Sequence, residues 1–207
     1  MKRILKAVMM LGLAATAVLG APEAGSFQPL VWCGLDYSKV KMIGALDFRQ
    51  PERIFPSMPA EWNALFMKEL LPKLESMAKS VQTDIKAVAD LNDTASAKQI
   101  EHEDGTADEK VKPSHITEAD IAEAVRSYKL KSEQGLGLVF IMDRLVKAQE
   151  TGCMYVVFFD VASRKVVHSE RLCDRAGGIG FRNYWFRPVK NVVDKLPKIY
   201  KTVKAGK

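Results

Sequence analysis

Two of the three cysteines occupy positions that favour a covalent link. The sequence predicts two antiparallel strands joined by a turn centred near Ser163, and Cys153 and Cys173 lie equally far from that serine. Residues at equal distances from a hairpin turn face each other across the strands, so a disulfide is one interpretation. The alternative is two buried free thiols, because a register slip of one residue would place the side chains on opposite faces. Cys33 stays unpaired in both interpretations.

A cysteine nucleophile is the second chemistry that these residues suggest. His168 lies midway along the strand after the turn, where it could serve as the base for Cys153. Such a pair needs the two side chains within hydrogen-bond reach, which the spacing alone does not provide. The hypothesis excludes the disulfide, because a disulfide-bonded cysteine has no thiolate to attack with.

Carboxylates and histidines gather between residues 90 and 123. A metal site could be built from six of these side chains: His102, His115, Glu101, Glu103, Asp104 and Asp108. The competing interpretation is an exposed acidic loop, because zinc ligands are normally closely spaced on a rigid frame. Residues 90–101 also resemble a calcium loop, but Ala95 stands where the sharp turn uses glycine and Lys98 places a cation at a ligand position. The sequence therefore predicts no metal ligand and no cofactor.

A glycine-rich stretch, residues 177–180, precedes the last predicted helix. Free N–H groups at a helix start can hold an anion, but the stretch lacks the pattern of a dinucleotide or phosphate loop. Arg182, Tyr184 and Arg187 follow it and form a basic and aromatic cluster typical of protein-binding hot spots. We take these three residues as a candidate partner surface, while Trp185 is equally explained as the anchor of the helix in the core. No hydrolase or Cys-x-x-Cys motif occurs, so no catalytic residue is predicted.

Three consecutive antiparallel strands are expected over residues 135–173, and the other elements must be arranged around them. Residues 154–159 are apolar on both alternating faces, which indicates a central strand covered on both sides. Amphipathic helices are expected over residues 60–77, with a kink or break at Pro72, and after Thr117 as N-cap. The pattern predicts an α/β (α+β) fold with a mixed sheet ending in a three-strand antiparallel meander, on which the helices pack.

The segments before the meander are less regular. Residues 39–48 are a strand candidate and residues 85–89 a weaker one, whereas residues 21–38 show no sustained period and are expected to form an irregular arm. Residues 92–112 are polar, acidic and without periodicity, which predicts a loop insertion. Residues 39–207 are therefore interpreted as a single domain that carries this loop.

Residues 1–20 have the pattern of a secretory signal peptide, with a cationic start, an apolar run and a small-residue cleavage site. The segment contains Lys2, Arg3 and Lys6, so its removal lowers the formal charge from +6 to +3. Ala21 stands where a lipid anchor would need cysteine, so a lipoprotein is disfavoured. No later segment reaches the ~20 apolar residues of a transmembrane helix. We expect an exported periplasmic or secreted protein for which nucleic acid is not a partner.

The order of elements resembles small exported α/β envelope domains of the TolB amino-terminal, LpoB and CsgG type. Residues 42–48 are similar to their opening strand, and residues 139–172 with the helix over 184–196 are similar to their closing meander and helix. The resemblance implies an accessory or binding domain of the cell envelope and transfers no functional residue.

Our leading hypothesis is a non-enzymatic exported module that binds an envelope protein or glycan. The contact would be made by residues 177–187 or by the basic terminal helix, whose lysines could also meet an anionic membrane surface. The alternative is a metal-dependent or cysteine-based enzyme.

Overall fold

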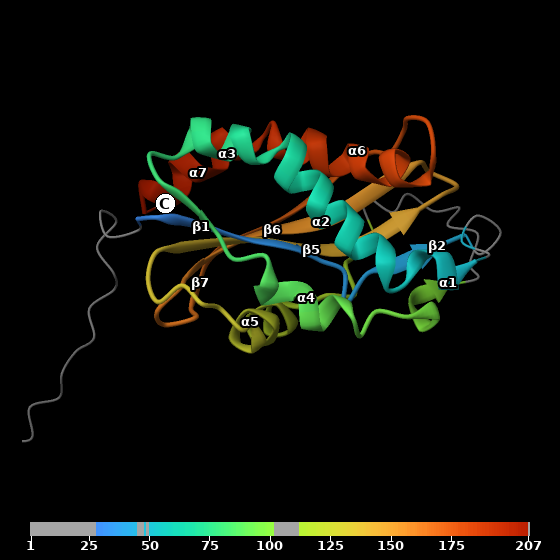
Figure 1. Cartoon of the computed structure of the whole chain (residues 1–207), viewed down its shortest axis with the longest axis horizontal. Coiled ribbons are helices and arrows are strands. Elements are labelled where there is room, and N and C mark those ends of the chain that lie inside the picture. The colour runs from blue at the N-terminus through green and yellow to red at the C-terminus, as the bar shows by residue number, and fades with distance from the viewer. Residues whose placement is uncertain (1–27, 45–47, 49, 102–111, 207) are drawn as a thin grey trace, which may run out of the picture.

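The computed structural model describes residues 28–44, 48, 50–101 and 112–206. The strands within these ranges form one seven-stranded sheet, and helices cover both of its faces (Figure 1). The predicted signal peptide lies outside the described residues. The mixed α/β fold with helices packed on a mixed sheet is confirmed.

Strand β5 (Leu136–Val146) is the centre of the sheet, and all of its 11 residues are buried. It pairs antiparallel with β6 (Thr151–Asp160), and β6 pairs antiparallel with β7 (Val166–Arg175). The predicted three-strand meander is therefore confirmed. The register of β5 against β6 shifts between Met142 and Arg144, so Asp143 sits at a β-bulge.

The other side of β5 is shared by two strands that lie end to end. β1 (Leu30–Asp36) runs parallel to the first half of β5, and β2 (Lys41–Ile43) runs parallel to its last residues. Two short parallel strands extend the sheet beyond them: β3 (Val81–Thr83) next to β1 and β4 (Ile100–Glu101) next to β2. One strand position of the sheet is thus filled by two segments joined by a turn.

The helices form two layers (Figure 1). The upper layer contains α2 (Ser57–Glu69), α3 (Leu71–Met77), α6 (Phe181–Val193) and α7 (Leu196–Lys204). The lower layer contains α4 (Lys86–Asn92) and α5 (Glu118–Ser127). Two short helical segments, α1 (Pro51–Ile54) and η1 (Ala97–Gln99), lie between strands along the chain.

Alternate side chains of β5 pack into two separate hydrophobic cores, one on each face of the sheet. Leu138 and Phe140 pack with the upper helices, around Trp32, whereas Val139 and Ile141 pack with α4 and α5. A strand buried on both faces must be apolar at both parities, which explains the continuous apolar run seen in the sequence.

Two helix boundaries follow from local sequence. Pro72 lies in the first turn of α3, and α2 ends just before it, because proline cannot donate the hydrogen bond of a helix interior. The Thr117 side chain accepts a hydrogen bond from the Asp120 N–H, and the Asp120 carboxylate accepts one from the Thr117 N–H, which completes a capping box at the start of α5. Both predicted boundaries are confirmed.

Two buried asparagines hold the end of β1. Asn63 accepts from the Leu35 N–H at 2.8 Å and donates to the Leu35 carbonyl at 3.0 Å. Asn92 donates to the same carbonyl at 2.9 Å and accepts from the Tyr37 N–H at 2.6 Å. Gly34 has a φ of 114°, and a Cβ there would lie 2.8 Å from Asn63 Oδ1. These contacts satisfy the backbone where β1 leaves the sheet.

Several predictions about the first half of the chain are wrong. The predicted irregular arm contains the buried strand β1, because pairing with β5 overrides the local prolines and glycines. Of the predicted strand at residues 39–48, only β2 forms among the described residues. Residues 85–89 belong to the start of α4, and the strand precedes them as β3. The predicted acidic loop at residues 92–112 begins with η1 and β4, and residues 102–111 lie outside the described part.

Cys153 and Cys173 face each other across β6 and β7 and are joined by a disulfide with an S–S distance of 2.09 Å. Cys33 is a buried free thiol, and burial raises its pKa far above the usual range. The disulfide encloses the hairpin turn, so it restricts the unfolded chain more than the folded one.

We expect the double substitution Cys153→Ser and Cys173→Ser to lower the free energy of unfolding by about 3 kcal/mol, the entropy of closing a loop of this length. Urea denaturation followed by circular dichroism measures the loss. Dithiothreitol should destabilise the wild-type chain by a similar amount and leave the double variant unchanged. Equal urea midpoints for the wild type and the double variant, both without reductant, would contradict the disulfide.

Candidate functional site

The predicted partner residues lie in the first two turns of α6. Arg182 and Arg187 are exposed, and Tyr184 is half-buried between the helix and the β5–β6 turn. Lys147 in that turn donates to the Tyr184 hydroxyl at 3.2 Å and stands 4.4 Å from the ring centroid. Trp185 is buried, so it is the core anchor of the helix and not a contact residue.

The glycine-rich loop before α6 is tied to the body at several points. The Gly177 N–H donates to the Tyr184 carbonyl at 3.1 Å, and the Tyr184 N–H donates to the Gly180 carbonyl at 2.9 Å. Gly178 and Gly180 have φ values of 117° and 80°, which other residues adopt only with strain. The loop before α6 is therefore hydrogen-bonded to the first turn of the helix that follows it.

Ile179 stands at the tip of this loop with 93% of its surface exposed. Among the described residues the only other exposed large apolar side chain is Val167, at 39%. Sequence analysis missed Ile179, although an isoleucine enclosed by glycines, outside any periodic segment, was a usable signal. We call Ile179, Arg182, Tyr184 and Arg187 the α6 amino-terminal surface.

Contacts below this surface fix its position. The Trp62 indole N–H on α2 donates to the Arg182 carbonyl at 2.9 Å, which joins the start of α6 to the upper helix layer. The Arg182 guanidinium lies 3.9 Å from the Glu61 carboxylate, in an ion pair whose two side chains are about half exposed. The surface therefore carries one exposed apolar side chain and two exposed arginines, and hydrogen bonds hold its backbone.

The structure does not bring the predicted cysteine–histidine pair together. Cys153 is bonded to Cys173, and His168 lies five positions before Cys173 on β7, so the two side chains point to opposite faces of the strand. His168 lies near Phe158, on the side of the sheet covered by α7. The cysteine-nucleophile hypothesis is wrong, since neither cysteine has a free thiol.

Residues 90–101, which resemble a calcium loop in sequence, do not fold as one. Asp90 and Asn92 belong to α4, where Asp90 pairs with Lys129 and Asn92 holds the end of β1. Four of the six side chains considered for a metal site lie outside the described residues: His102, Glu103, Asp104 and Asp108. A fifth, His115, contacts the Asp143 carboxylate. No group of three potential metal ligands occurs within the described ranges.

A polar centre that the sequence did not predict surrounds Asp143, which is completely buried. Arg171 from β7 donates through Nε at 2.7 Å, and the adjacent Arg144 lies 3.2 Å away through Nε. The other carboxylate oxygen accepts from Ser114 at 2.9 Å and lies 3.0 Å from His115 Nδ1. Burial raises the pKa of Asp143, but the hydrogen bond from His115 and the two guanidinium charges outweigh it, so its pKa is lowered.

The Asp143 centre lacks the geometry of a catalytic relay. The Ser114 hydroxyl donates to Asp143 and not to histidine, and His115 Nε2 lies 2.8 Å from the Lys39 carbonyl. Both ring nitrogens of His115 therefore face acceptors and neither is placed to take a proton from a nucleophile. Arg144 and Arg171 also donate to the Pro113 and Lys112 carbonyls at 3.1 Å, so the centre holds the segment before α5 against the sheet.

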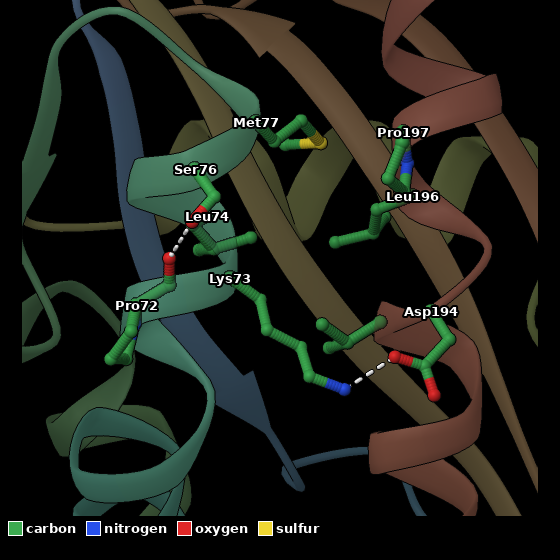
Figure 2. Close-up of a pocket in the computed structure, with 9 residues that line it drawn as sticks. Pro72, Lys73, Leu74, Ser76, Met77, Asp194, Leu196 and Pro197 are labelled. Atoms are coloured by element: carbon green, nitrogen blue, oxygen red, sulfur yellow. Dashed lines mark hydrogen bonds and ion pairs between the residues drawn. The ribbon is translucent and has the colours of Figure 1, made fainter.

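A groove of about 360 Å³ lies between α3 and the α6–α7 junction (Figure 2). Leu74, Met77 and Leu196 line its apolar walls, and the ion pair between Lys73 and Asp194 crosses it. The Ser76 hydroxyl in its lining donates to the Pro72 carbonyl at 2.8 Å, and no histidine lines the groove to activate it. A smaller apolar cavity of about 210 Å³ lies between α2 and α4.

No protein family, curated protein or solved structure matches the chain. The resemblance to exported envelope domains therefore stays a prediction. None of the helices in the described ranges is long and apolar enough to cross a membrane.

We expect Asp143→Asn to lower the free energy of unfolding by about 3 kcal/mol near neutral pH, because Arg144 and Arg171 would then be buried without a counter-charge. Asp90→Asn, which removes an exposed ion pair with Lys129, is the matched control and should cause no measurable loss. Urea denaturation of both variants at pH 7 measures the difference. Equal losses would show that the Asp143 centre is not a stabilising network.

The effect of Asp143→Asn should shrink in acid. The pKa of Asp143 is lowered in the folded state, so its stabilisation is complete above the unfolded pKa near ~3.9 and is lost as the pH falls through the folded pKa. Wild type and variant should therefore converge in stability as the pH falls below about 4. A gap that stays constant from pH 7 to pH 3 would contradict this assignment.

Proposed function

We propose that the chain is an exported, non-enzymatic binding module that docks an acidic protein of the cell envelope through the α6 amino-terminal surface. The observation that carries the proposal is Ile179, exposed to 93% on a hydrogen-bonded loop that leads into the helix bearing two exposed arginines. Burying one isoleucine in a partner pocket contributes about 1.5–3 kcal/mol. Because hydrogen bonds already order the loop, it loses little further conformational entropy when a partner binds.

Charge and composition support a protein partner. Arginine and tyrosine are enriched in binding hot spots, and Arg182, Tyr184 and Arg187 lie in the first two turns of the helix that follows the isoleucine. Two cations favour a partner with carboxylates opposite them. The disulfide between Cys153 and Cys173 fits an oxidising compartment and leaves no thiol for a cysteine enzyme at this hairpin.

The basic terminal helix is a weaker candidate for docking. Leu196, Ile199, Tyr200 and Val203 form the buried face of α7 and pack into the upper core. Membrane-binding helices insert their apolar face into the lipid, but the apolar face of α7 is buried in the protein core. Its lysines can therefore add only a charge contribution that salt would screen.

The test is co-sedimentation of the chain from residue 21 onward with envelope membranes of its host, before and after protease treatment of those membranes. We expect Ile179→Asp to weaken binding at least tenfold, since it removes the apolar contact and adds a charge that opposes an acidic partner. Val167→Asp changes the other exposed apolar side chain and is the matched control, which should bind like wild type.

A photo-crosslinking residue at position 179 should join the chain to one protein, whereas the same residue at position 167 should not. Equal binding by the Ile179→Asp and Val167→Asp variants would refute the surface assignment. Binding that survives protease treatment of the membranes would point to lipid or glycan and would refute the protein partner.

A further inference from the structure

The His115 ring connects two parts of the molecule that are far apart in the sequence. It lies in the segment before α5, between the buried Asp143 of β5 and the turn that joins β1 to β2. Its Nδ1 lies 3.0 Å from the Asp143 carboxylate, and its Nε2 lies 2.8 Å from the Lys39 carbonyl oxygen. One imidazole therefore ties the β1–β2 turn to the centre of the sheet.

Both partners of the ring can only accept a hydrogen bond. A carbonyl oxygen has no proton to give. Despite its burial, Asp143 has a lowered pKa, through the hydrogen bond from His115 and two guanidinium charges, so it is an ionised acceptor near neutral pH. A neutral imidazole has one N–H, so its second nitrogen would direct a lone pair at one of these acceptors. Only the imidazolium form has a proton for each contact.

The two hydrogen bonds of the ring differ in strength. The bond to Asp143 joins opposite charges, whereas the carbonyl of Lys39 is a neutral acceptor. When the imidazolium gives up one proton to solvent, the remaining proton therefore stays on Nδ1, and Nε2 turns a lone pair toward the carbonyl. The ring can exchange this proton, since 27% of its side chain is exposed. Loss of the proton thus breaks the contact with the turn and keeps the contact with the core.

Charged groups of both signs surround the ring within the described ranges. The buried side comes from β5 and β7, and the exposed side comes from the β1–β2 turn, β2, η1 and α5. These groups are Asp143, Arg144, Arg171, Lys39, Lys41, Lys98 and Asp120. Because the charges are mixed, the proton on Nε2 is assigned from its 2.8 Å contact with a carbonyl and not from a net charge.

We propose that His115 is a pH-sensitive latch on the β1–β2 turn. In the closed state the imidazolium donates to Asp143 and to the Lys39 carbonyl, and in the open state the neutral ring keeps Asp143 and releases the turn. The closed state holds one proton more than the open state, so a rise in pH favours the open state. Gln99 also donates to two carbonyls of the turn, so the open state is a loosened turn and not an unfolded one.

Nuclear magnetic resonance of the chain from residue 21 onward, at about pH 5 and about pH 8.5, tests the latch, since imidazole side chains change charge in this range. The chemical shifts of the ring nitrogens show which of them carry a proton. We expect both nitrogens of His115 to be protonated at the lower pH and Nδ1 alone at the higher pH. Hydrogen-exchange protection factors, which are corrected for the intrinsic effect of pH, should then fall about tenfold for the amides of Tyr37, Ser38 and Val40.

Two histidine variants separate the latch from other effects of pH. His115→Gln removes the titrating ring and should abolish the pH dependence of protection in the turn, whereas His168→Gln on β7 is the matched control and should keep it. The nitrogen shifts are measured on the wild type, so they test the latch even where His115→Gln fails to fold.

Three results would overturn the latch: an unprotonated ring nitrogen of His115 at the lower pH, two protonated nitrogens at the higher pH, or protection of the turn that does not fall with the loss of the proton. The same pH dependence in His115→Gln as in the wild type would also overturn it. Envelope docking through Ile179 uses other elements and should be unchanged in His115→Gln, so the two proposals fail or hold separately.

Discussion

The burial of an ionic pair in the central strand is the constraint on which much of the structure depends. β5 is buried along its whole length, yet it carries Asp143 and Arg144 at a bulge. A buried carboxylate is tolerated only when its hydrogen-bonding capacity is filled, and here Arg171, Ser114 and His115 complete that requirement. The network joins β5, β7 and the segment before α5, three parts that are far apart in the sequence. Breaking such a network is costly because it leaves buried charges uncompensated, so it selects one arrangement of these parts.

The same network reaches the surface. His115 connects Asp143 to the Lys39 carbonyl, so the position of the β1–β2 turn depends on the buried centre. Two asparagines fix the start of that turn at Leu35 and Tyr37. The position of a surface turn thus depends on a buried polar network. The α6 amino-terminal surface is supported separately, through the hydrogen bond from Trp62 and the packing of Trp185 in the upper core.

Local chemistry explains which elements could be predicted. The break at Pro72, the capping box at Thr117 and the alternating apolar runs of the meander are properties of a few neighbouring residues. Strand β1 was missed because its segment contains Gly34 and follows Pro29, both unfavourable for a strand when judged alone. Parallel pairing with β5, about a hundred residues later in the chain, supplies the hydrogen bonds that outweigh this local preference.

The sequence by itself determined the fold class, the meander, the opposed positions of Cys153 and Cys173 and the basic cluster at α6, because each depends on spacing along one short segment. Only the tertiary structure decided that the disulfide forms, since register fixes which faces the cysteines occupy. It also decided that Ile179 is exposed while Trp185 is buried, and that His115 meets Asp143 rather than a metal cluster within the described residues. Burial and convergence of charges depend on contacts between distant segments, and a single sequence carries no local signal for such contacts.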